Sequence, residues 1–289
     1  MIGNSSTAAP TVSVVVPTYN SERFVEACLG SVCAQTFRQI ELIVVDGFSS
    51  DGTVERAREF TDRIYTYGPR QRKRRVFGAP RQRNYGASLA SGSFIYYVDV
   101  DMVLPPTLIQ ECVEAATQSD WQALIVPERS FGLGFWAKAK EIERACYQGD
   151  DLVEAPRFVR RDAWEALGGL DANIGGGGDD WDLHIRLRQA GFSVGRVRQE
   201  ILHNEGRLTL TRLVKKRYLY GQQIPSFIRR HGMSRSFHQY NPLRRGYFRN
   251  RSLFLKDPAH ALGFVVMRTA EYAAGGIGLT VGLVRPPEK

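Results

Sequence analysis

Acidic residues that stand close together are the first candidates for chemistry. Asp99 and Asp101 flank a single residue, Val100, directly after the apolar segment Phe94–Val98. Two carboxylates at the end of a strand can hold a hard divalent cation such as Mg²⁺ or Mn²⁺, and the cation can neutralise a diphosphate. Acidic pairs at the start of a loop also act as solvated residues or caps. The pair alone leaves both interpretations open.

A second acidic group follows four glycines. Gly175–Gly178 precede Asp179, Asp180 and Asp182, and a helical pattern continues to Gln189. Carboxylates at a helix start can cap free N–H groups and interact favourably with the helix dipole. They can equally provide a general base on a rigid helix beside a glycine loop.

His203 is a third candidate, because it follows the apolar pair Ile201-Leu202. A single histidine is commonly a surface or core residue, but it can complete a metal site. The segment 171–182 matches a calcium loop only in part, because its fifth position is Gly175 and its last is aspartate rather than glutamate. A Rossmann G-x-G-x-x-G after a strand, a Walker A loop and a G-x-S-x-G elbow are all absent, which argues against nicotinamide, P-loop and serine-hydrolase chemistry.

Short apolar runs alternate with helical patterns in the first half of the chain, and these elements would position the acidic residues. Such runs, with helices between them, predict a mostly parallel sheet that is covered on both faces. Ligands bind beyond the carboxyl ends of the strands in such sheets, which is where Asp46, Asp99 and Asp101 stand. The expected strands are Val12–Val16, Ile40–Val45, Arg63–Tyr67 and Phe94–Val98. The expected helices are one capped by Ser21, two at Thr53–Phe60 and Pro80–Leu89, and one that starts at Pro105-Pro106.

The second half is less regular. From Leu208 to Arg230 the pattern is helical, and we expect a basic, aromatic stretch of low regularity beyond it. The other expected elements are strands at Ala123–Val126, Phe158–Arg160 and Glu200–His203, and helices at Phe135–Tyr147 and from Asp179 to Gln189.

Charge is distributed unevenly. The 289 residues carry 39 Lys and Arg against 30 Asp and Glu, a net charge of +9. Thirteen of the basic residues, and no acidic ones, lie between Arg207 and Lys256, so the rest of the chain has a net charge of −4. The composition, 43% hydrophobic and 24% charged, is typical of a soluble globular protein and excludes a disordered, collagenous or coiled-coil chain.

The four cysteines show no zinc-ligand spacing, so we interpret Cys28, Cys33, Cys112 and Cys146 as reduced core thiols, which favours a cytosol-facing location. The N-terminus lacks the pattern of a signal peptide. Only Ala261–Val284 approaches membrane length, but it contains two charged residues and five glycines. We therefore expect a surface-lying or buried segment rather than a span.

Five sequence blocks in order resemble the family-2 glycosyltransferases, which are inverting enzymes of the GT-A fold. They are Val14–Asn20 (VVVPTYN), Ile43–Gly47 with Ser50–Thr53, Arg83–Ala87 with Ala90–Gly92, Val98–Asp101 (VDVD), and Gly178–Leu183 (GDDWDL) with Arg186-Leu187. The resemblance covers residues 12–190 and gives little guidance beyond about residue 205. It implies a GT-A domain at 11–205 with a Rossmann-like sheet. From composition and pattern we expect a flexible N-terminus at 1–10 and a helical basic extension at 206–289, with an apolar membrane-associating segment at 261–284.

The resemblance also implies roles for individual residues. Asp180, or its neighbour Asp179, would be the general base that takes the proton of the acceptor hydroxyl. Asp101, with Asp99 and His203, would hold Mg²⁺ or Mn²⁺. The donor, a nucleotide-diphosphate sugar, would contact Pro17, Thr18, Tyr19, Asn20, Asp46, Asp51, Arg81, Asn84, Asp99 and Val100.

Three departures from the family pattern matter. Gly47-Phe48-Ser49 follows Asp46 where many members have a second aspartate, which puts the ribose contacts in doubt. Asp179 replaces the usual glutamate, so the identity of the base is open between the two aspartates, and we favour Asp180. The Gln-x-x-Arg-Trp signature of processive synthases is missing, which argues for a non-processive enzyme that transfers one sugar.

The basic segment Arg207–Lys256 also contains eight aromatic residues, and the apolar 261–284 follows it. Cations with aromatics suit anionic lipid headgroups, nucleic acid or a merely solvated face. The apolar neighbour favours a peripheral membrane enzyme at the cytoplasmic face. It would act on an acceptor hydroxyl or phosphate, such as that of a polyprenyl phosphate, a lipid-linked sugar or another glycan; nucleic acid is the less favoured partner. A second cluster, 70–75, would face the diphosphate or the same lipid surface.

Two other functions remain as alternatives. One is a non-catalytic nucleic-acid or membrane-binding module on a transferase scaffold, but the intact acidic set argues against it. The other is a nucleotidyltransferase, which would need a glycine-rich, Lys- or Arg-bearing loop after the first strand. Pro17–Asn20 is not such a loop.

Overall fold

A seven-stranded sheet forms the centre of the molecule. The computed structural model describes residues 11–68, 78–151 and 153–284. Four neighbouring strands run parallel, and one strand, β8, is antiparallel to both of its neighbours. The order is β3 (Ile64–Thr66), β2 (Ile40–Asp46), β1 (Val12–Thr18), β4 (Phe94–Tyr97), β8 (Phe158–Arg160), β6 (Ala123–Ile125) and β9 (Val194–Arg196).

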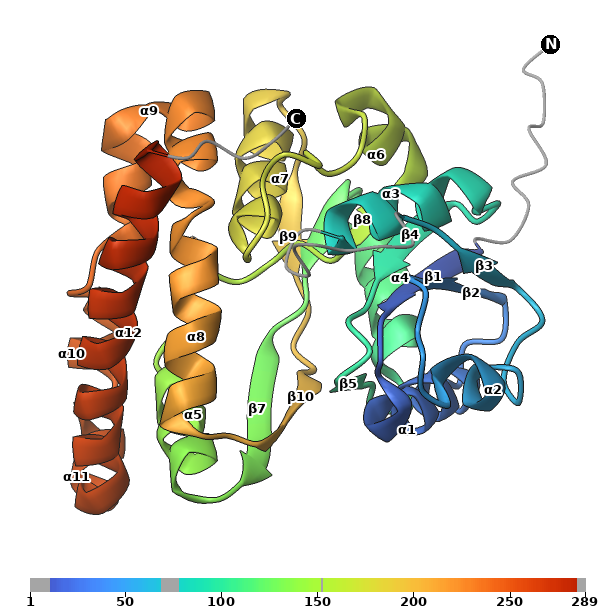
Figure 1. The fold of residues 1–289 in the computed structure, drawn as a ribbon. Coiled ribbons are helices and arrows are strands. Elements are labelled where there is room, and N and C mark those ends of the chain that lie inside the picture. Colours follow the sequence, from blue (N-terminus) through green and yellow to red (C-terminus); the bar gives the residue numbers. More distant parts are fainter. Residues whose placement is uncertain (1–10, 69–77, 152, 285–289) are drawn as a thin grey trace, which may run out of the picture.

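Helices cover both faces of this sheet because its strands are apolar on both sides. On one face Val14 packs with α1 (Glu22–Cys33) and α4 (Leu108–Gln118). On the other face Val15 packs with α3 (Ala79–Leu89), α6 (Arg161–Leu167) and α7 (Gly178–Gln189). Figure 1 shows α3, α6 and α7 on one side of the sheet, and α1 with the short α2 (Thr53–Ala57) on the other. The predicted doubly covered, mostly parallel sheet is confirmed.

A second, three-stranded sheet extends from the main one. Its order is β5 (Met102–Val103), β10 (Ile201–Arg207) and β7 (Glu128–Leu133). In β10 the register pairs His203 with Met102 of β5 and with Ser130 of β7. This sheet therefore brings residues after β4 beside a strand that lies about a hundred residues later in the chain.

The C-terminal part is helical and packs on the rest. Its helices are α8 (Leu210–Gly221), α9 (Ile224–Tyr240, non-helical at Gly232), α10 (Arg245–Arg249), α11 (Arg251–Lys256) and α12 (Pro258–Val284), and α5 (Phe135–Ala145) lies beside them. Met267 and Phe264 of α12 are buried in one cluster with Leu213 of α8 and Ala139 of α5. In the part of the chain that the structure describes, no helix is long and apolar enough to cross a membrane.

Several sequence expectations need correction. The first strand continues through Pro17 to Thr18, and α2 ends at Ala57 rather than at Phe60. The segment after Arg230 is mostly helical, not irregular. Strands β5, β7 and β9 and helix α6 were not expected, because each is short and depends on partners distant in the sequence.

Two local expectations also differ from the structure. Ser21 occupies the N-cap position of α1, but its hydroxyl donates to the Tyr19 carbonyl at 3.1 Å and does not cap the helix. Cys28, Cys112 and Cys146 are buried free thiols as expected, whereas Cys33 is exposed. The predicted basic cluster at 70–75 lies outside the described residues, as does the N-terminal segment 1–10.

Candidate active site

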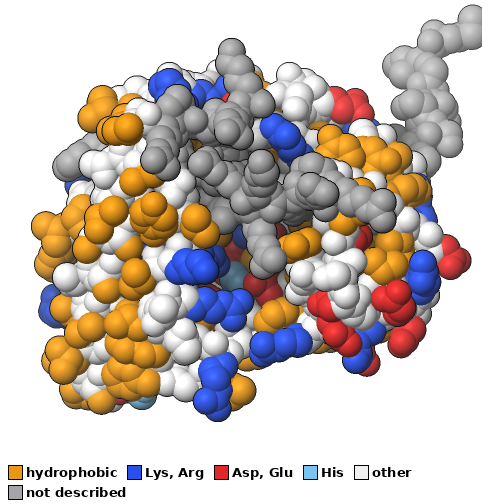
Figure 2. Space-filling model, in the orientation of Figure 1, with side chains coloured by type: hydrophobic (Ala, Val, Ile, Leu, Met, Phe, Trp, Pro, Cys, Tyr) orange, Lys and Arg blue, Asp and Glu red, His pale blue; other side chains and the backbone are white. Residues whose placement is uncertain are grey.

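The carboxyl ends of β1, β2 and β4 meet at one edge of the main sheet. Thr18 pairs with Asp46 across β1 and β2, and the Val98 N–H donates to the Val15 carbonyl at 3.0 Å, so the chain after β4 leaves beside the end of β1. A cleft of about 650 Å³ opens there. Figure 2 shows a hollow in which acidic side chains and a histidine are visible, with Lys and Arg side chains along its rim.

The glycine loop determines how α7 enters this cleft. Gly176 and Gly177 have φ values of +70° and +83°, a conformation that residues with a Cβ rarely adopt. Gly177 is the N-cap, and no side chain caps the helix. Asp179 and Asp180 therefore do not act as N-caps, and both line the cleft from the first turn.

Asp182 has a different environment from its two neighbours. It is completely buried and accepts hydrogen bonds from the Arg186 side chain and from Nε2 of His231 at 2.9 Å. The Arg230 guanidinium lies 2.7 Å from the same carboxylate. Asp182 therefore anchors α9 to α7, and Arg230 of the basic segment Arg207–Lys256 pairs with its charge.

Two buried arginines organise the remaining carboxylates. Arg83 of α3 contacts Asp99, donates to Asp179 at 2.8 Å and lies 3.7 Å from Asp180. Its side chain is only 6% exposed. A buried guanidinium with three carboxylates around it is stabilised as a cation and fixes their geometry.

Arg157 is the second of these arginines, and it contacts two of the same carboxylates as well as Glu128. It contacts Asp99 at 3.2 Å, Glu128 at 2.7 Å and Asp180 at 3.6 Å. Both guanidiniums also lie over the ring of Tyr97, at 4.9 and 5.7 Å from its centroid.

Arg83 and Arg157 give the aspartates of the cleft different electrostatic environments. Burial would raise the pKa of Asp99, but Arg83 and Arg157 hold it well below its usual range. Burial, followed by the negative charge of Asp180, raises the pKa of Asp179 to about 7. Asp180 differs in its contacts, because its Oδ1 is buried and has no hydrogen-bond partner among the described residues.

Asp101 and His203 meet across the small sheet. Asp101 Oδ2 lies 3.3 Å from His203 Nε2, and His203 Nδ1 lies 3.3 Å from Glu128 Oε2. The antiparallel register of β5 and β10 causes this meeting, because it pairs His203 with the residue after Asp101. Burial would lower the pKa of His203, but Asp101 and Glu128 raise it to about 10.

Asp101 and His203 Nε2 could both ligate a divalent cation, which would then replace the proton that His203 holds at its raised pKa. Adjacent ligands of an octahedral Mg²⁺ stand about 3 Å apart, close to the observed separation, and the contact of Glu128 with Nδ1 leaves Nε2 directed at Asp101. Asp99 does not join them, because its two oxygens contact Arg83 and Arg157. No group of three or more His, Cys, Asp or Glu that could hold a metal occurs in the described part of the chain.

The turn after β1 forms another part of the cleft. Pro17, Thr18 and Tyr19 line it. Asp46 is buried behind them, where it accepts hydrogen bonds from Thr18 Oγ1 at 2.9 Å and from the backbone N–H of Ser49 at 2.8 Å. Ser49 thus binds Asp46 in the stretch Gly47-Phe48-Ser49, where the sequence departs from the pattern that it resembles. Asn20 has a φ of +46°, and its Oδ1 accepts from the Ser50 N–H at 2.8 Å.

The other predicted contact residues have separate surroundings. Asp51 accepts from the Glu22 N–H at 3.2 Å and contacts Thr53, so it joins the starts of α1 and α2. Asn84 bonds both backbone groups of Leu170. Arg81 is exposed on the first turn of α3, and Val100 lies in the cleft lining beside Asp99 and Asp101.

Sequence reasoning missed Arg83, Arg157 and Glu128 as members of this site. Arg83 stands inside a recognised block, so its position was a usable signal. Arg157 and Glu128 are isolated charged residues, and their contact depends on the residue before β8 lying beside the start of β7 in the folded chain. No spacing in the sequence predicts that contact.

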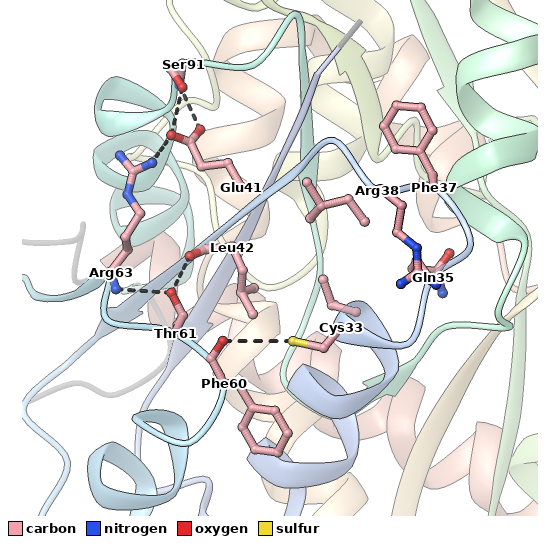
Figure 3. Close-up of a pocket in the computed structure, with 12 residues that line it drawn as sticks. Cys33, Gln35, Phe37, Arg38, Glu41, Leu42, Phe60, Thr61, Arg63 and Ser91 are labelled. Carbon is pink, nitrogen blue, oxygen red and sulfur yellow. Dashed lines mark hydrogen bonds and ion pairs between the residues drawn. The ribbon is translucent and has the colours of Figure 1, made fainter.

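A second pocket lies at the opposite end of the strands. Figure 3 shows it near the start of β2, lined by Glu41, Arg63, Ser91 and Cys33 among others. Its Glu41 accepts hydrogen bonds from Ser91 and contacts Arg63. The carboxylates of the cleft lie at the other end of the strands from this pocket. We therefore take the cleft, and not this pocket, as the candidate active site.

Residues 13–165 match the sequence model described as Glycosyl transferase family 2, and this region is more than half of the chain. The chain belongs to that family. It is 32% identical over 137 residues to an uncharacterized glycosyltransferase, EpsJ, of Bacillus subtilis, which covers 46% of this chain and 36% of that protein. The family-2 glycosyltransferase described here therefore aligns with about a third of the length of this relative.

Two characterised relatives have informative names. The GalNAc(5)-diNAcBac-PP-undecaprenol beta-1,3-glucosyltransferase of Campylobacter jejuni is 30% identical over 151 residues, which are 50% of this chain and 48% of that protein. The UDP-Glc:alpha-D-GlcNAc-diphosphoundecaprenol beta-1,3-glucosyltransferase WfgD of Escherichia coli is 40% identical over 91 residues, which are 31% of this chain and 34% of that one.

Solved structures show the fold over nearly the whole chain. The mannosyltransferase PcManGT of Pyrobaculum calidifontis, solved with GDP-Man and Mn²⁺, superposes with a TM-score of 0.65 at 17% identity and covers 98% of this chain and 89% of its own. Staphylococcus aureus TarS residues 1–349, with UDP-GlcNAc, gives a TM-score of 0.54 at 13% identity, covering 94% and 90%. The family-2 glycosyltransferase has the GT-A fold.

Proposed function

We propose that this enzyme moves one sugar from a nucleoside-diphosphate sugar to a hydroxyl of its acceptor in a single inverting displacement. The observation that carries the proposal is the carboxylate of Asp180, which lines the same cleft as the Asp101–His203 pair and accepts no hydrogen bond at Oδ1 from the described residues. The Arg83 guanidinium lies 3.7 Å from Oδ1, beyond hydrogen-bond distance, so this carboxylate can still accept a proton from a bound hydroxyl. The cleft size is in the range of small-molecule sites.

The proposed step uses few groups. The acceptor hydroxyl donates its proton to Asp180 as its oxygen attacks the anomeric carbon, and the bond between that carbon and the diphosphate oxygen breaks on the opposite face. One such displacement inverts the anomeric centre. Arg83 and Arg157 lie 3.7 and 3.6 Å from the Asp180 carboxylate, while Arg83 also holds Asp179 at 2.8 Å.

Donor binding would involve the predicted residues. Asp101 and His203 would hold Mg²⁺ or Mn²⁺, which when bound neutralises charge on the diphosphate. The turn Pro17–Asn20, fixed by Asp46, would receive the base or ribose. In this proposal Asp99 keeps the two arginines in place rather than ligating the metal. Asp51 and Asn84 would support the donor site without contacting the donor, because their side chains already form hydrogen bonds with backbone groups.

The acceptor is proposed to be lipid-linked, and the enzyme to work peripherally at the cytoplasmic face of a membrane. The names of two relatives, which specify undecaprenol-linked diphosphate sugars, support a lipid-linked acceptor. An exposed apolar face on α12 supports the membrane surface: Leu262, Val265, Val266, Ile277, Leu283 and Val284. In this proposal residues 11–205 are the catalytic domain and 206–289 the extension that reaches acceptor and membrane.

Donor binding can be tested by thermal denaturation with UDP, GDP and their sugars, with and without Mn²⁺. A ligand that binds only the folded state raises the melting temperature, with about 2.7 kcal/mol of stabilisation at a hundred times its Kd. We expect one nucleotide class to shift the wild type and Asp62→Ala, an exposed control, only when Mn²⁺ is present. Asp101→Ala should lose the Mn²⁺-dependent shift. A wild type that no nucleotide stabilises contradicts the proposed function.

A further inference from the structure

Beyond Asp180, the cleft continues along a wall that the proposed mechanism does not use. Trp181, Gln239, Tyr240 and Arg244 all line it. They come from the first turn of α7, the end of α9 and the start of α10. The turn after β1, where we propose that the donor binds, lines the same cleft.

Two aromatic rings line the cleft together with the proposed base. Trp181 follows Asp180 in the chain, and its ring centroid lies 5.5 Å from that of Tyr240 at an interplanar angle of 72°. The Trp181 Nε1–H donates to the Val153 carbonyl at 3.2 Å, which fixes the indole. A side-chain carbon placed at Gly178 would be 3.7 Å from Tyr240 Oη, so Tyr240 reaches the start of α7. Rigid aromatic surfaces with a polar edge suit the mixed apolar and hydroxylated surface of a sugar.

Gln239 adds an unused hydrogen-bond acceptor to this surface. The residue is 5% exposed, and its Oε1 is buried without a partner among the described residues. An unsatisfied buried amide oxygen is unfavourable unless a ligand or water donates to it. A hydroxyl of a bound sugar is such a donor.

Arg244 provides a cation without an acidic partner in the described part of the chain. Its guanidinium lies 5.3 Å from the centroid of the Tyr147 ring and contacts the Gln239 carbonyl, and its Nε is buried with no partner there. Arg268 on the same wall differs, because it pairs with Glu143 at 3.0 Å and with Glu271. An arginine left uncompensated in a cleft is suited to a phosphate, which its planar fork can bind with two hydrogen bonds.

We propose that this wall binds an acceptor sugar that carries a phosphate: the sugar ring lies on Trp181 and Tyr240, one hydroxyl donates to Gln239, and the phosphate binds Arg244. The proposal rests on the proposed function and specifies its acceptor as a glycosyl phosphate or diphosphate. Trp181 follows Asp180 and contacts Tyr240, and Arg244 contacts the backbone carbonyl of Gln239, so in this proposal the sugar lies between Asp180 and the phosphate. The acceptor hydroxyl then lies at the end of the sugar that faces the donor.

The test is equilibrium titration of the full-length protein, with its donor site saturated by the stabilising nucleoside diphosphate and Mn²⁺. The probes are α-glucose 1-phosphate, methyl α-glucoside as its phosphate-free counterpart, inorganic phosphate and dodecyl phosphate. We expect α-glucose 1-phosphate to bind at least tenfold more tightly than methyl α-glucoside. Tighter binding of dodecyl phosphate than of inorganic phosphate would identify a lipid as the source of the phosphate, and equal binding would identify a free glycosyl phosphate.

Arg244→Gln should weaken the binding of α-glucose 1-phosphate about tenfold, because a charge-assisted hydrogen bond is lost. Arg244→Lys should retain part of the affinity. The matched control is Arg245→Gln, which removes the same charge from an exposed neighbouring position and should change the affinity less than twofold. Melting temperatures of all variants check that they fold.

Three results would overturn the proposal. They are equal affinity for the two glucose compounds, equal effects of the Arg244 and Arg245 variants, and a loss of nucleoside diphosphate affinity in Arg244→Gln. The last result would assign Arg244 to the donor. In each case nucleotide binding by the wild type, measured in the same titrations, shows whether the proposed function itself still stands.

Discussion

At the scale of single residues, adjacent aspartates on one helix turn have different surroundings. Asp179 is 5% exposed and bonded to Arg83, whereas Asp180 is 14% exposed and has an oxygen with no hydrogen-bond partner among the described residues. The base should be the carboxylate that can still accept a proton from substrate. This argument from contacts favours Asp180 and gives Asp179 a positioning role.

Asp179 should make stability depend on pH. Its folded-state pKa is raised to about 7, while an unfolded aspartate titrates near ~3.9. The folded state therefore binds more protons in between, and the free energy of unfolding falls as pH rises from about 4 to 7. Asp179→Asn removes the destabilising buried charge, so at pH 8, without metal or nucleotide, it should raise the melting temperature. The rise should be roughly 2–4 °C for each kcal/mol of destabilisation removed, and much less at pH 4.5.

Thermal denaturation of Asp179→Asn and of the exposed control Asp62→Asn across this pH range checks the expectation. If the difference between Asp179→Asn and wild type is the same at both pH values, the raised pKa of Asp179 is wrong.

At the scale of elements, glycines let α8 and α12 touch along their backbones. A Cβ at Gly278 would be 2.1 Å from the Tyr218 carbonyl oxygen, and one at Gly221 would be 2.3 Å from that of Gly275. Side chains cannot occupy these positions unless the helices separate. The contact matters for function because both helices line the cleft.

Gly278→Ala should therefore lower the free energy of unfolding by about 1–3 kcal/mol, because overpacking forces the backbones apart. Gly276→Ala is the matched control on the same helix. A Cβ there meets nothing within 4 Å, and alanine favours a helix over glycine by about 1 kcal/mol. Denaturant titration distinguishes them. Equal effects of the two substitutions would contradict the tight α8–α12 contact.

The elements around the main sheet could be predicted from the sequence, and those of the small sheet could not. Apart from Ser13, Val12–Val16 is apolar because helices cover both faces, and such a run predicts a strand from the sequence alone. In β7, by contrast, only Ser130 is buried, so no periodic pattern marks Glu128–Leu133 as a strand. Its pairing with β10 forms only in the folded chain.

The same difference applies to the candidate site. Asp101, Asp180 and His203 were predicted because their spacing after strands or glycines matches a family pattern. The pair of Arg83 and Arg157 was not, since its members come from separate elements and each contacts several carboxylates at once. Spacing in the sequence predicts which residues are neighbours on one helix or strand. The charge balance of a buried site cannot be predicted in this way, because it depends on residues from several elements.

At the scale of the whole molecule, the cations of the basic segment Arg207–Lys256 lie in three different environments rather than on one surface. Arg230 neutralises Asp171 and Asp182 inside the protein. Another group lines the cleft: Arg212, Lys216, Arg217 and Arg244. A third group is exposed on α10 and α11: Arg245, Arg249, Arg251 and Lys256. The sequence-based assignment of the whole segment to a membrane surface was therefore too simple.

The exposed cations lie on the two helices that precede α12, whose outer face carries exposed apolar side chains. Figure 2 shows hydrophobic side chains along the edge of the molecule where Figure 1 places α12. Cations with an apolar surface would bind anionic bilayers, and binding should weaken from 0.05 to 0.5 M NaCl because salt screens the charges.

Co-sedimentation with vesicles of anionic phospholipid tests this surface. Leu262→Asp should reduce the bound fraction severalfold, because it places a charge on the apolar face. Met233→Asp is the control, since Met233 on α9 is as exposed as Leu262, at 71% against 67%. Vesicle binding that neither substitution weakens would mean that another surface contacts the lipid.

The central claim is that Asp180 is the base of a metal-dependent sugar transfer. Its most direct test is the Mn²⁺-dependent release of nucleoside diphosphate from the nucleotide sugar that stabilises the protein, for wild type and Asp180→Asn. We predict a rate about 10²–10⁴ times lower in the variant, with unchanged affinity for the nucleoside diphosphate. A variant that retains more than a tenth of the wild-type rate would contradict the account.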